Sequence, residues 1–158
     1  MMKVVLASLT LILAATVSHD GSAASRLKQP EFITFSGECL KVTMGKQDMT
    51  RACTGMLGGS SHKDGRTGIY FMLANNHILT FSGAPNGTDR RGGFTVDRVV
   101  FNTGEEAVPA QTLRATGRCS YTDPSRGPVT VRCAGALGEG TAFVASFRTD
   151  GTAPQAVR

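Results

Sequence analysis

The sequence predicts an all-β protein, a small β-sandwich or barrel of about eight strands with an internal duplication, stapled by two disulfides. Three observations favour this class: a repeat that carries two cysteine pairs, a series of short apolar segments between turn residues, and the lack of a helical period. No window of eleven residues keeps a clear spacing of 3.6 between its apolar positions. Short strands separated by turn residues are typical of antiparallel sheets that pack face to face or close into a barrel.

The first 24 residues predict a secretory signal peptide. Lys3 gives a positive start, residues 4–17 form an uncharged apolar run, and Ser22-Ala23-Ala24 places small residues before a cleavage site. A transmembrane anchor is the alternative, but this run is shorter than the ~20 residues that cross a bilayer. We therefore expect a periplasmic or secreted protein, with a single β-rich domain over residues 25–158 and no membrane span after processing.

Two segments of the chain repeat each other at a constant offset of 80 residues, within copies near 32–75 and 112–151. Matching cysteines, glycines and an apolar position are what a duplicated, cross-linked structural unit would share, whereas a catalytic constellation would occur once. We therefore also expect a pseudo-twofold relation between the two halves. The aligned pairs are Gly37/Gly117, Cys39/Cys119, Thr50/Thr130, Cys53/Cys133, Gly55/Gly135, Leu57/Leu137 and Gly58/Gly138.

The four cysteines predict two disulfides, because an even number of cysteines in an exported chain indicates a disulfide framework. A zinc site is disfavoured, since the chain has no close C-x₂₋₄-C pair and few histidines. Three connectivities are possible, and the repeat favours the pairing of neighbours within each copy. If each copy forms a hairpin, its cysteines face each other and the bridge staples that hairpin. The favoured bridges are Cys39–Cys53 and Cys119–Cys133.

Apolar, β-rich segments supply the remaining strands. The first copy continues into residues 69–73 and the second into residues 143–147. Between the copies, residues 78–81 and 94–101 have the same character. A first strand begins at Phe32 and continues through the first cysteine of its copy.

Turn residues separate these segments. Gly45-Lys46-Gln47 is predicted as a three-residue hairpin loop, and Pro124-Ser125-Arg126-Gly127 as a type I turn that ends in a left-handed glycine. Ala74-Asn75-Asn76-His77 is predicted as a tight turn, and Ser82–Gly93 as a long polar loop.

The formal net charge of +5 favours contact with anionic surfaces such as lipopolysaccharide, an acidic polymer or nucleic acid. Adjacent arginines in the glycine-rich loop present guanidinium groups that can fork onto phosphate or carboxylate, although a solvated loop is the alternative. Nucleic acid is disfavoured because this loop has no aromatic side chain for base stacking. The candidate binding residues are Arg90, Arg91 and Arg126, with Arg66, Arg98 and Lys46 extending a basic face.

No motif for catalysis, a metal or another cofactor emerges. His62 and His77 are the only histidines after the predicted cleavage site, and neither belongs to a metal-ligand spacing. Residues 60–64 hold Ser, His and Asp close in sequence, but triad partners meet through the fold, and no G-x-S-x-G elbow is present. The four cysteines are expected to be structural. We therefore predict no cofactor and no catalytic residues, and disfavour an enzyme.

Three motifs of the second half resemble a pattern in small exported proteins of α-proteobacteria whose function is unknown. They are Gly117-Arg118-Cys119, Gly127-Pro128-Val129-x-Val131-x-Cys133 and Phe143-x-Ala145-x-Phe147-x-Thr149-Asp150-Gly151. The resemblance implies a Gram-negative periplasmic or secreted setting, and it implies no activity and no site residues.

Three functions follow from the sequence. The first is a non-enzymatic binding or envelope-associated module whose partner is an anionic envelope component or an exported protein. The second is an inhibitor of an exported hydrolase, which would present the 82–93 loop or the hairpin tip near Arg126 as a rigid loop. The third is a small hydrolase that uses His62 or His77 with a distant carboxylate.

Overall fold

The computed structural model describes residues 31–84, 92–123 and 126–157. The predicted signal peptide lies outside these residues. Two short 3-10 turns, η1 (Thr50–Ala52) and η2 (Ala74–Asn76), lie between strands of the described chain. The strands are β1 (Glu31–Met44), β2 (Gln47–Asp48), β3 (Cys53–Ser61), β4 (Thr67–Leu73), β5 (Ile78–Gly83), β6 (Gly93–Asn102), β7 (Gln111–Tyr121), β8 (Thr130–Leu137), β9 (Ala142–Thr149) and β10 (Gln155–Val157).

Eight of the strands close into an antiparallel barrel in the order β1-β3-β4-β5-β6-β7-β8-β9, and β9 pairs with β1 to complete the circle. The extra strands β2 and β10 pair with opposite ends of β1. The predicted all-β class is confirmed, and the barrel is the form that it takes. Closure gives every strand of the circle two neighbours, which removes exposed sheet edges from it.

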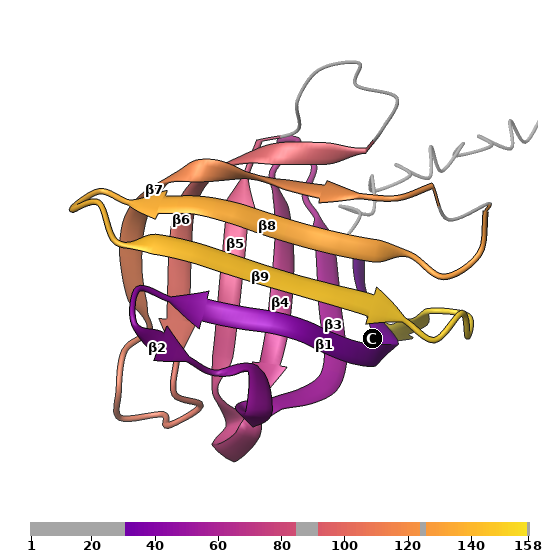
Figure 1. The fold of residues 1–158 in the computed structure, drawn as a ribbon, viewed down its shortest axis with the longest axis horizontal. Helices are drawn as coiled ribbons and strands as arrows, with labels where there is room; N and C mark the ends of the chain where they lie inside the picture. Colours follow the sequence, from indigo (N-terminus) through magenta and orange to yellow (C-terminus); the bar gives the residue numbers. More distant parts are fainter. Residues whose placement is uncertain (1–30, 85–91, 124–125, 158) are drawn as a thin grey trace, which may run out of the picture.

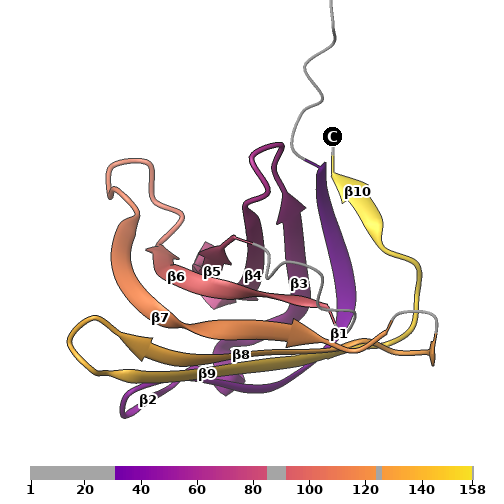
Figure 2. The same cartoon turned by 90° about the horizontal axis from the view of Figure 1, so that it is seen from above.

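The barrel is flattened into two layers that cross nearly at right angles (Figure 1). The front layer consists of β7, β8, β9 and the second half of β1, and the rear layer consists of β3 to β6. Figure 2 shows the same arrangement from above. Strand β1 belongs to both layers, because Glu31–Ser36 pair with β3 whereas Gly37–Met44 pair with β9. The change occurs at Gly37, where a Cβ atom would overlap the carbonyl oxygen of Arg148.

Phenylalanine rings fill the space between the layers. Phe71 contacts Phe81 and Phe147 edge to face, with ring centroids 5.8 and 6.5 Å apart, and Phe81 lies 5.1 Å from Phe143. All four side chains are buried. The interior is thus a packed core, and recognition has to use the outward-facing sides of the strands.

Both predicted disulfides are present. Cys119 and Cys133 are register partners on β7 and β8 with a Cα–Cα distance of 4.0 Å, so this bridge staples a hairpin as expected. Cys39 and Cys53 are bonded with a Cα–Cα distance of 6.1 Å, but they do not face each other in the sheet. The expectation of a stapled hairpin was wrong here, because β1 leaves β3 at Gly37 and Cys39 pairs with Phe147 instead.

The turn after β1 also differs from the prediction. Met44 pairs with Gln47, so the turn contains two residues, Gly45 and Lys46, and Gln47 begins β2. Strand β2 and the turn η1 carry the chain around the corner before β3 begins at Cys53.

Two other turns fit the prediction. Asn75 and Asn76 have φ values of 59° and 60° and form the tight turn between β4 and β5. Gly127 has a φ of 112°, as expected of the glycine that ends the β7–β8 turn, although Pro124 and Ser125 lie outside the described residues.

The repeat maps onto strands in the same order. The first copy supplies the neighbouring strands β1, β3 and β4, and the second supplies β7, β8 and β9. Two disulfides fit an extracellular or periplasmic location. Among the described residues, no helix has the length and apolar character needed to cross a membrane.

Candidate functional site

The outer side of the front layer is basic because of the alternation of side chains along its strands. Cys119, Val131, Cys133 and Phe147 are buried and point into the barrel. The residues next to them therefore point outward. Three of these outward residues are Arg118 on β7, Arg132 on β8 and Arg148 on β9.

The strand register places these arginines in a diagonal row. Arg118 lies opposite Ala134, and Arg132 precedes Ala134 by two residues on β8. Arg132 lies opposite Ser146, and Arg148 is two residues further along β9. Diagonal neighbours of this kind are about 7–8 Å apart. We call Arg118, Arg132 and Arg148 the arginine row.

Small side chains surround the row. Ser120 and Ser146 lie on either side of Arg132, while Ala134 separates Arg118 from Val144 on the same face. Long charged side chains on such a surface can extend without competing for space. The row therefore follows a line across three strands, which suits contact with an extended ligand.

Arg132 and Arg148 have no ion pair with any carboxylate of the described residues. Arg148 lies opposite Glu38 in the register, yet their charged groups form no ion pair. The nearby cation Lys41 differs, since its Nζ lies 3.1 Å from Asp48 Oδ2. Arg132 and Arg148 are therefore exposed cations that form no ion pair among the described residues.

Of the predicted binding residues, Arg126 lies next to the arginine row, at the β7–β8 turn. Its side chain is 86% exposed, with Nε 3.7 Å from Asp123 Oδ2. Two shallow depressions flank this turn, and Arg126 lines both of them, with Arg132 in one and Arg148 in the other. Arg90 and Arg91 lie outside the described residues, so their role stays a prediction.

The other predicted cations do not join the row. Lys46 lies in the β1–β2 turn. Arg66 binds Asp97 through two hydrogen bonds, from Nη1 to Oδ1 at 2.9 Å and from Nη2 to Oδ2 at 2.8 Å. Arg98 donates from Nε to the same carboxylate at 3.3 Å. The hydrogen bonds from Arg66 are the main cause that lowers the pKa of Asp97 from 3.8, so this carboxylate stays charged.

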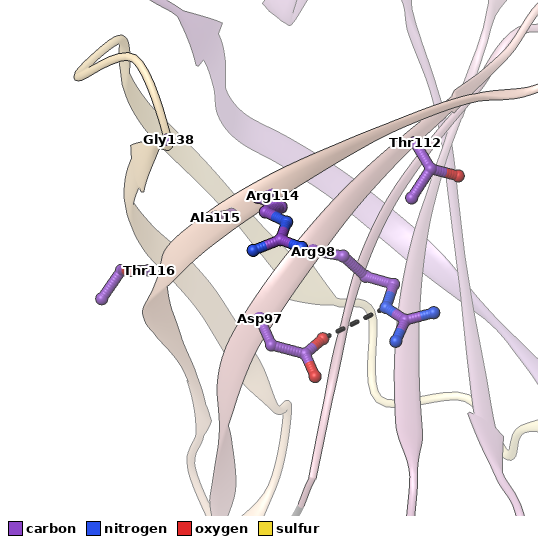
Figure 3. A pocket seen from close by; sticks show the side chains of 7 residues that line it. All are labelled: Asp97, Arg98, Thr112, Arg114, Ala115, Thr116 and Gly138. Atoms are coloured by element: carbon purple, nitrogen blue, oxygen red, sulfur yellow. Dashed lines mark hydrogen bonds and ion pairs between the residues drawn. The ribbon is translucent and has the colours of Figure 1, made fainter.

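An irregularity in the sheet exposes this second group of charges (Figure 3). Val96 pairs with Gly117 and Arg98 with Arg114, so β7 has one more residue than β6 between these positions. Such a β-bulge bends the strand locally. The depression beside it, here called the bulge depression, is lined by Asp97, Arg98, Thr112, Arg114, Ala115, Thr116 and Gly138.

The histidines are not assembled with a carboxylate in the described part of the chain. His62 Nε2 lies 3.4 Å from Ser60 Oγ, and that hydroxyl lies 2.8 Å from the hydroxyl of Tyr70. Asp64 instead accepts a hydrogen bond from the backbone N–H of Arg66 at 3.0 Å, within the β3–β4 turn. The adjacency of Ser, His and Asp in the sequence thus produces no relay among these residues. His77 packs its ring against Phe101, with centroids 5.4 Å apart.

No group of three or more His, Cys, Asp or Glu side chains suited to a metal ion occurs in the described ranges. The arginine row was missed by the sequence analysis, although a signal for two of its members exists. Arg118 and Arg132 each precede a cysteine of the second copy. Since a buried cysteine points inward, its neighbour on a strand points outward.

Comparison of the chain with protein-family models, with curated proteins and with solved structures gives no match. The interpretation of the site therefore depends on its own geometry and charge.

Proposed function

We propose that the protein is a non-enzymatic binding module for anionic polymers, with the outer side of the front layer as its binding surface. One observation carries this proposal: the arginine row crosses three neighbouring strands, and Arg132 and Arg148 have no ion pair in the described structure. The residues that the two copies share build the framework, whereas all three arginines of the row belong to the second copy.

A polymer with regularly spaced negative charges fits this surface. Guanidinium groups bind phosphate, sulfate and carboxylate groups through paired N–H donors. Three cations at intervals of about 7–8 Å can contact successive charges of one extended chain. Each contact releases counterions from the polymer, which makes binding favourable and salt-dependent.

The chemistry of the face favours recognition of charge rather than of bases. The side chains between the arginines are serine and alanine, which offer no ring for stacking. We therefore propose an acidic polysaccharide or a phosphate-bearing polymer of the cell envelope as the ligand class. The two disulfides support a place in the periplasm or outside the cell, where such polymers occur.

The test compares two double variants that remove the same net charge. Arg132→Gln with Arg148→Gln changes the row, while Lys46→Gln with Arg51→Gln changes exposed cations near the β1–β2 turn. Binding of dextran sulfate is measured by fluorescence anisotropy over a range of salt concentrations. The row variant is expected to bind at least ~10-fold more weakly, with a salt slope reduced by about 1.4, while the control stays close to the wild type. Equal losses in both variants would show that only net charge matters.

A second candidate, the inhibitor of an exported hydrolase, draws support from exposed apolar side chains near the β7–β8 turn. Leu40 is 45% and Tyr121 is 37% exposed, and each lines one of the depressions that contain Arg126. Aromatic and aliphatic anchors beside an arginine are typical of protein-binding surfaces. A pull-down from envelope extract on the immobilised protein distinguishes the two candidates. A bound polymer that elutes at high salt favours the polymer-binding function. A bound protein that resists high salt, and that the variant Leu40→Ser with Tyr121→Ser no longer retains, favours the inhibitor.

A further inference from the structure

A second cluster of arginines lies at the bulge depression, on the part of β7 that precedes Arg118. Arg98 on β6 and Arg114 on β7 are register partners. Like charges directly opposite each other in an antiparallel pair destabilise the sheet. Their placement therefore costs stability unless a negative group lies between or beside them.

Asp97 supplies only part of the compensation. Both of its carboxylate oxygens accept hydrogen bonds from Arg66, at 2.9 and 2.8 Å, and one of them also accepts a bond from Arg98 Nε at 3.3 Å. Arg114 has no hydrogen bond or ion pair from its side chain to any described residue. Arg66 is balanced by Asp97 and by the nearby Asp64, so the guanidinium groups of Arg98 and Arg114 are the cations that face the depression.

Neutral donors line the same depression. Thr112 and Thr116 are exposed, and their hydroxyl groups make no hydrogen bond within the described structure. Figure 3 shows Asp97, Arg98 and Arg114 gathered at the bulge, with Thr112 on one side and Thr116 on the other. The guanidinium groups of Arg98 and Arg114 can donate paired N–H bonds to a tetrahedral anion. Thr112 or Thr116 can add one hydroxyl, since four residues of strand keep the two hydroxyls about 13 Å apart.

We propose that the bulge depression binds a dianionic oxyanion, with a phosphate group as the best match in charge. Arg114 is the principal ligand, Arg98 contributes the N–H groups that Asp97 does not use, and one threonine hydroxyl, of Thr112 or Thr116, adds a neutral donor. Arg66 has a positioning role, since it holds Asp97 and thereby orients Arg98. The site uses no residue of the arginine row, so it does not depend on the function proposed for that row.

Isothermal titration with inorganic phosphate tests the site, and glycerol 3-phosphate serves as a second probe that represents a monoester on a larger molecule. The wild type is expected to bind one phosphate. Arg114→Gln is expected to weaken binding at least ~10-fold, because it removes the forked donor. The row variant, Arg132→Gln with Arg148→Gln, is expected to bind phosphate as the wild type does. Binding of glycerol 3-phosphate but not of phosphate would identify a monoester site, and the reverse would identify a site for the free ion.

Thermal unfolding supplies a second measurement, which separates phosphate binding by Arg114 from a purely structural role of this side chain. Phosphate should raise the melting temperature of the wild type and leave that of Arg114→Gln unchanged, since ligand binding to the native state stabilises it. Without phosphate, Arg114→Gln should be at least as stable as the wild type, because it removes a like-charge pair. Equal phosphate binding by wild type and Arg114→Gln, loss of binding only in the row variant, or no binding to the wild type would each overturn the proposal.

Discussion

The two repeat copies have the same framework and different surfaces. Cys39 and Cys53 correspond to Cys119 and Cys133, while the aligned leucines Leu57 and Leu137 are both buried. At outward positions the copies diverge: Glu38 of the first corresponds to Arg118 of the second, and Ala52 corresponds to Arg132. Shared residues thus build the barrel, and residues that differ between the copies give one layer its charge.

Equal spacing does not impose equal geometry, however. Cys119 and Cys133 join two paired strands and are fully buried. Cys39 and Cys53 bridge the point where β1 passes from the rear layer to the front layer, and both are only partly buried. The second bridge thus reinforces an existing hairpin, whereas the first connects the layers at a corner of the barrel.

Removal of the buried bridge should have the largest effect. Cys119→Ala with Cys133→Ala is expected to lower the free energy of unfolding by about 3 kcal/mol from loop-closure entropy. Loss of two buried sulfur atoms adds roughly 1–2 kcal/mol. The melting temperature should fall by about 10 °C or more in a thermal unfolding scan. A fall of only a few degrees would mean that the buried bridge contributes little to stability.

Removal of the corner bridge should cost less. The Cys39–Cys53 bridge closes a loop of the same length, so Cys39→Ala with Cys53→Ala should also lower the free energy of unfolding by about 3 kcal/mol. The cavity that the variant leaves is smaller, because these sulfur atoms are only partly buried. Since reduction needs access to sulfur, dithiothreitol should reduce this bridge first in the folded protein, as measured by alkylation and peptide mapping. Faster reduction of Cys119–Cys133 would contradict the difference between the two bridges.

The surface difference can be tested by making the first copy resemble the second. Glu38→Arg places the aligned residue of the second copy opposite Arg148 and extends the arginine row onto β1. Affinity for dextran sulfate should rise several-fold. Stability should fall slightly, because two arginines then lie directly opposite each other in the sheet. Glu106→Arg, an exposed site before β7, adds the same charge and serves as the control. An equal gain in both variants would remove the special role of the front layer.

The smallest effect concerns a carboxylate that only the first copy has. Asp48 accepts hydrogen bonds from the hydroxyl and backbone N–H of Thr50 at 2.6 and 2.9 Å, and these are the main causes that lower its pKa to about 2. Because this pKa is below its usual value, the carboxylate stabilises the fold above about pH 4 and loses this effect as the pH falls towards 2. The aligned residue of the second copy is Pro128.

The measurement is an acid titration followed by circular dichroism in moderate urea. Asp48→Asn should be less stable than the wild type at neutral pH and should lose less stability between pH 4 and pH 2. Thr122→Val, which removes a hydroxyl that accepts from the N–H of Thr130 in the second copy, is the uncharged control. Parallel acid curves for wild type and Asp48→Asn would show that this carboxylate does not stabilise the corner.

Local patterns in the sequence were sufficient for most of the strands and for the disulfide pairing. The constant offset of 80 residues favoured both bridges, and apolar, β-rich segments predicted β4, β5, β6 and β9 within a few residues, whereas β2 and β10 were not predicted. Closure of the barrel was not predictable, because it requires one strand to pair with both β3 and β9 across more than 100 residues of sequence. Gly37 allows that change through close contact with Arg148, which only the assembled structure shows.

For the candidate site, the sequence predicted the positive charge but not which residues form the surface. An excess of arginine indicated an anionic partner, and Arg126 does lie beside the basic face. The arginine row itself results from the register of β8 against β9, which the sequence does not specify. The signal peptide and the contribution of Arg90 and Arg91 stay predictions.

Backbone amide NMR shifts of the wild-type protein during titration with dextran sulfate test the central claim most directly. We expect the perturbed amides to cluster on β7, β8 and β9 around Arg132 and Arg148, and we expect high salt to reverse these shift perturbations. Perturbations concentrated on β3 to β6, or at the β1–β2 turn with its exposed cations, would contradict the assignment of the binding surface to the front layer.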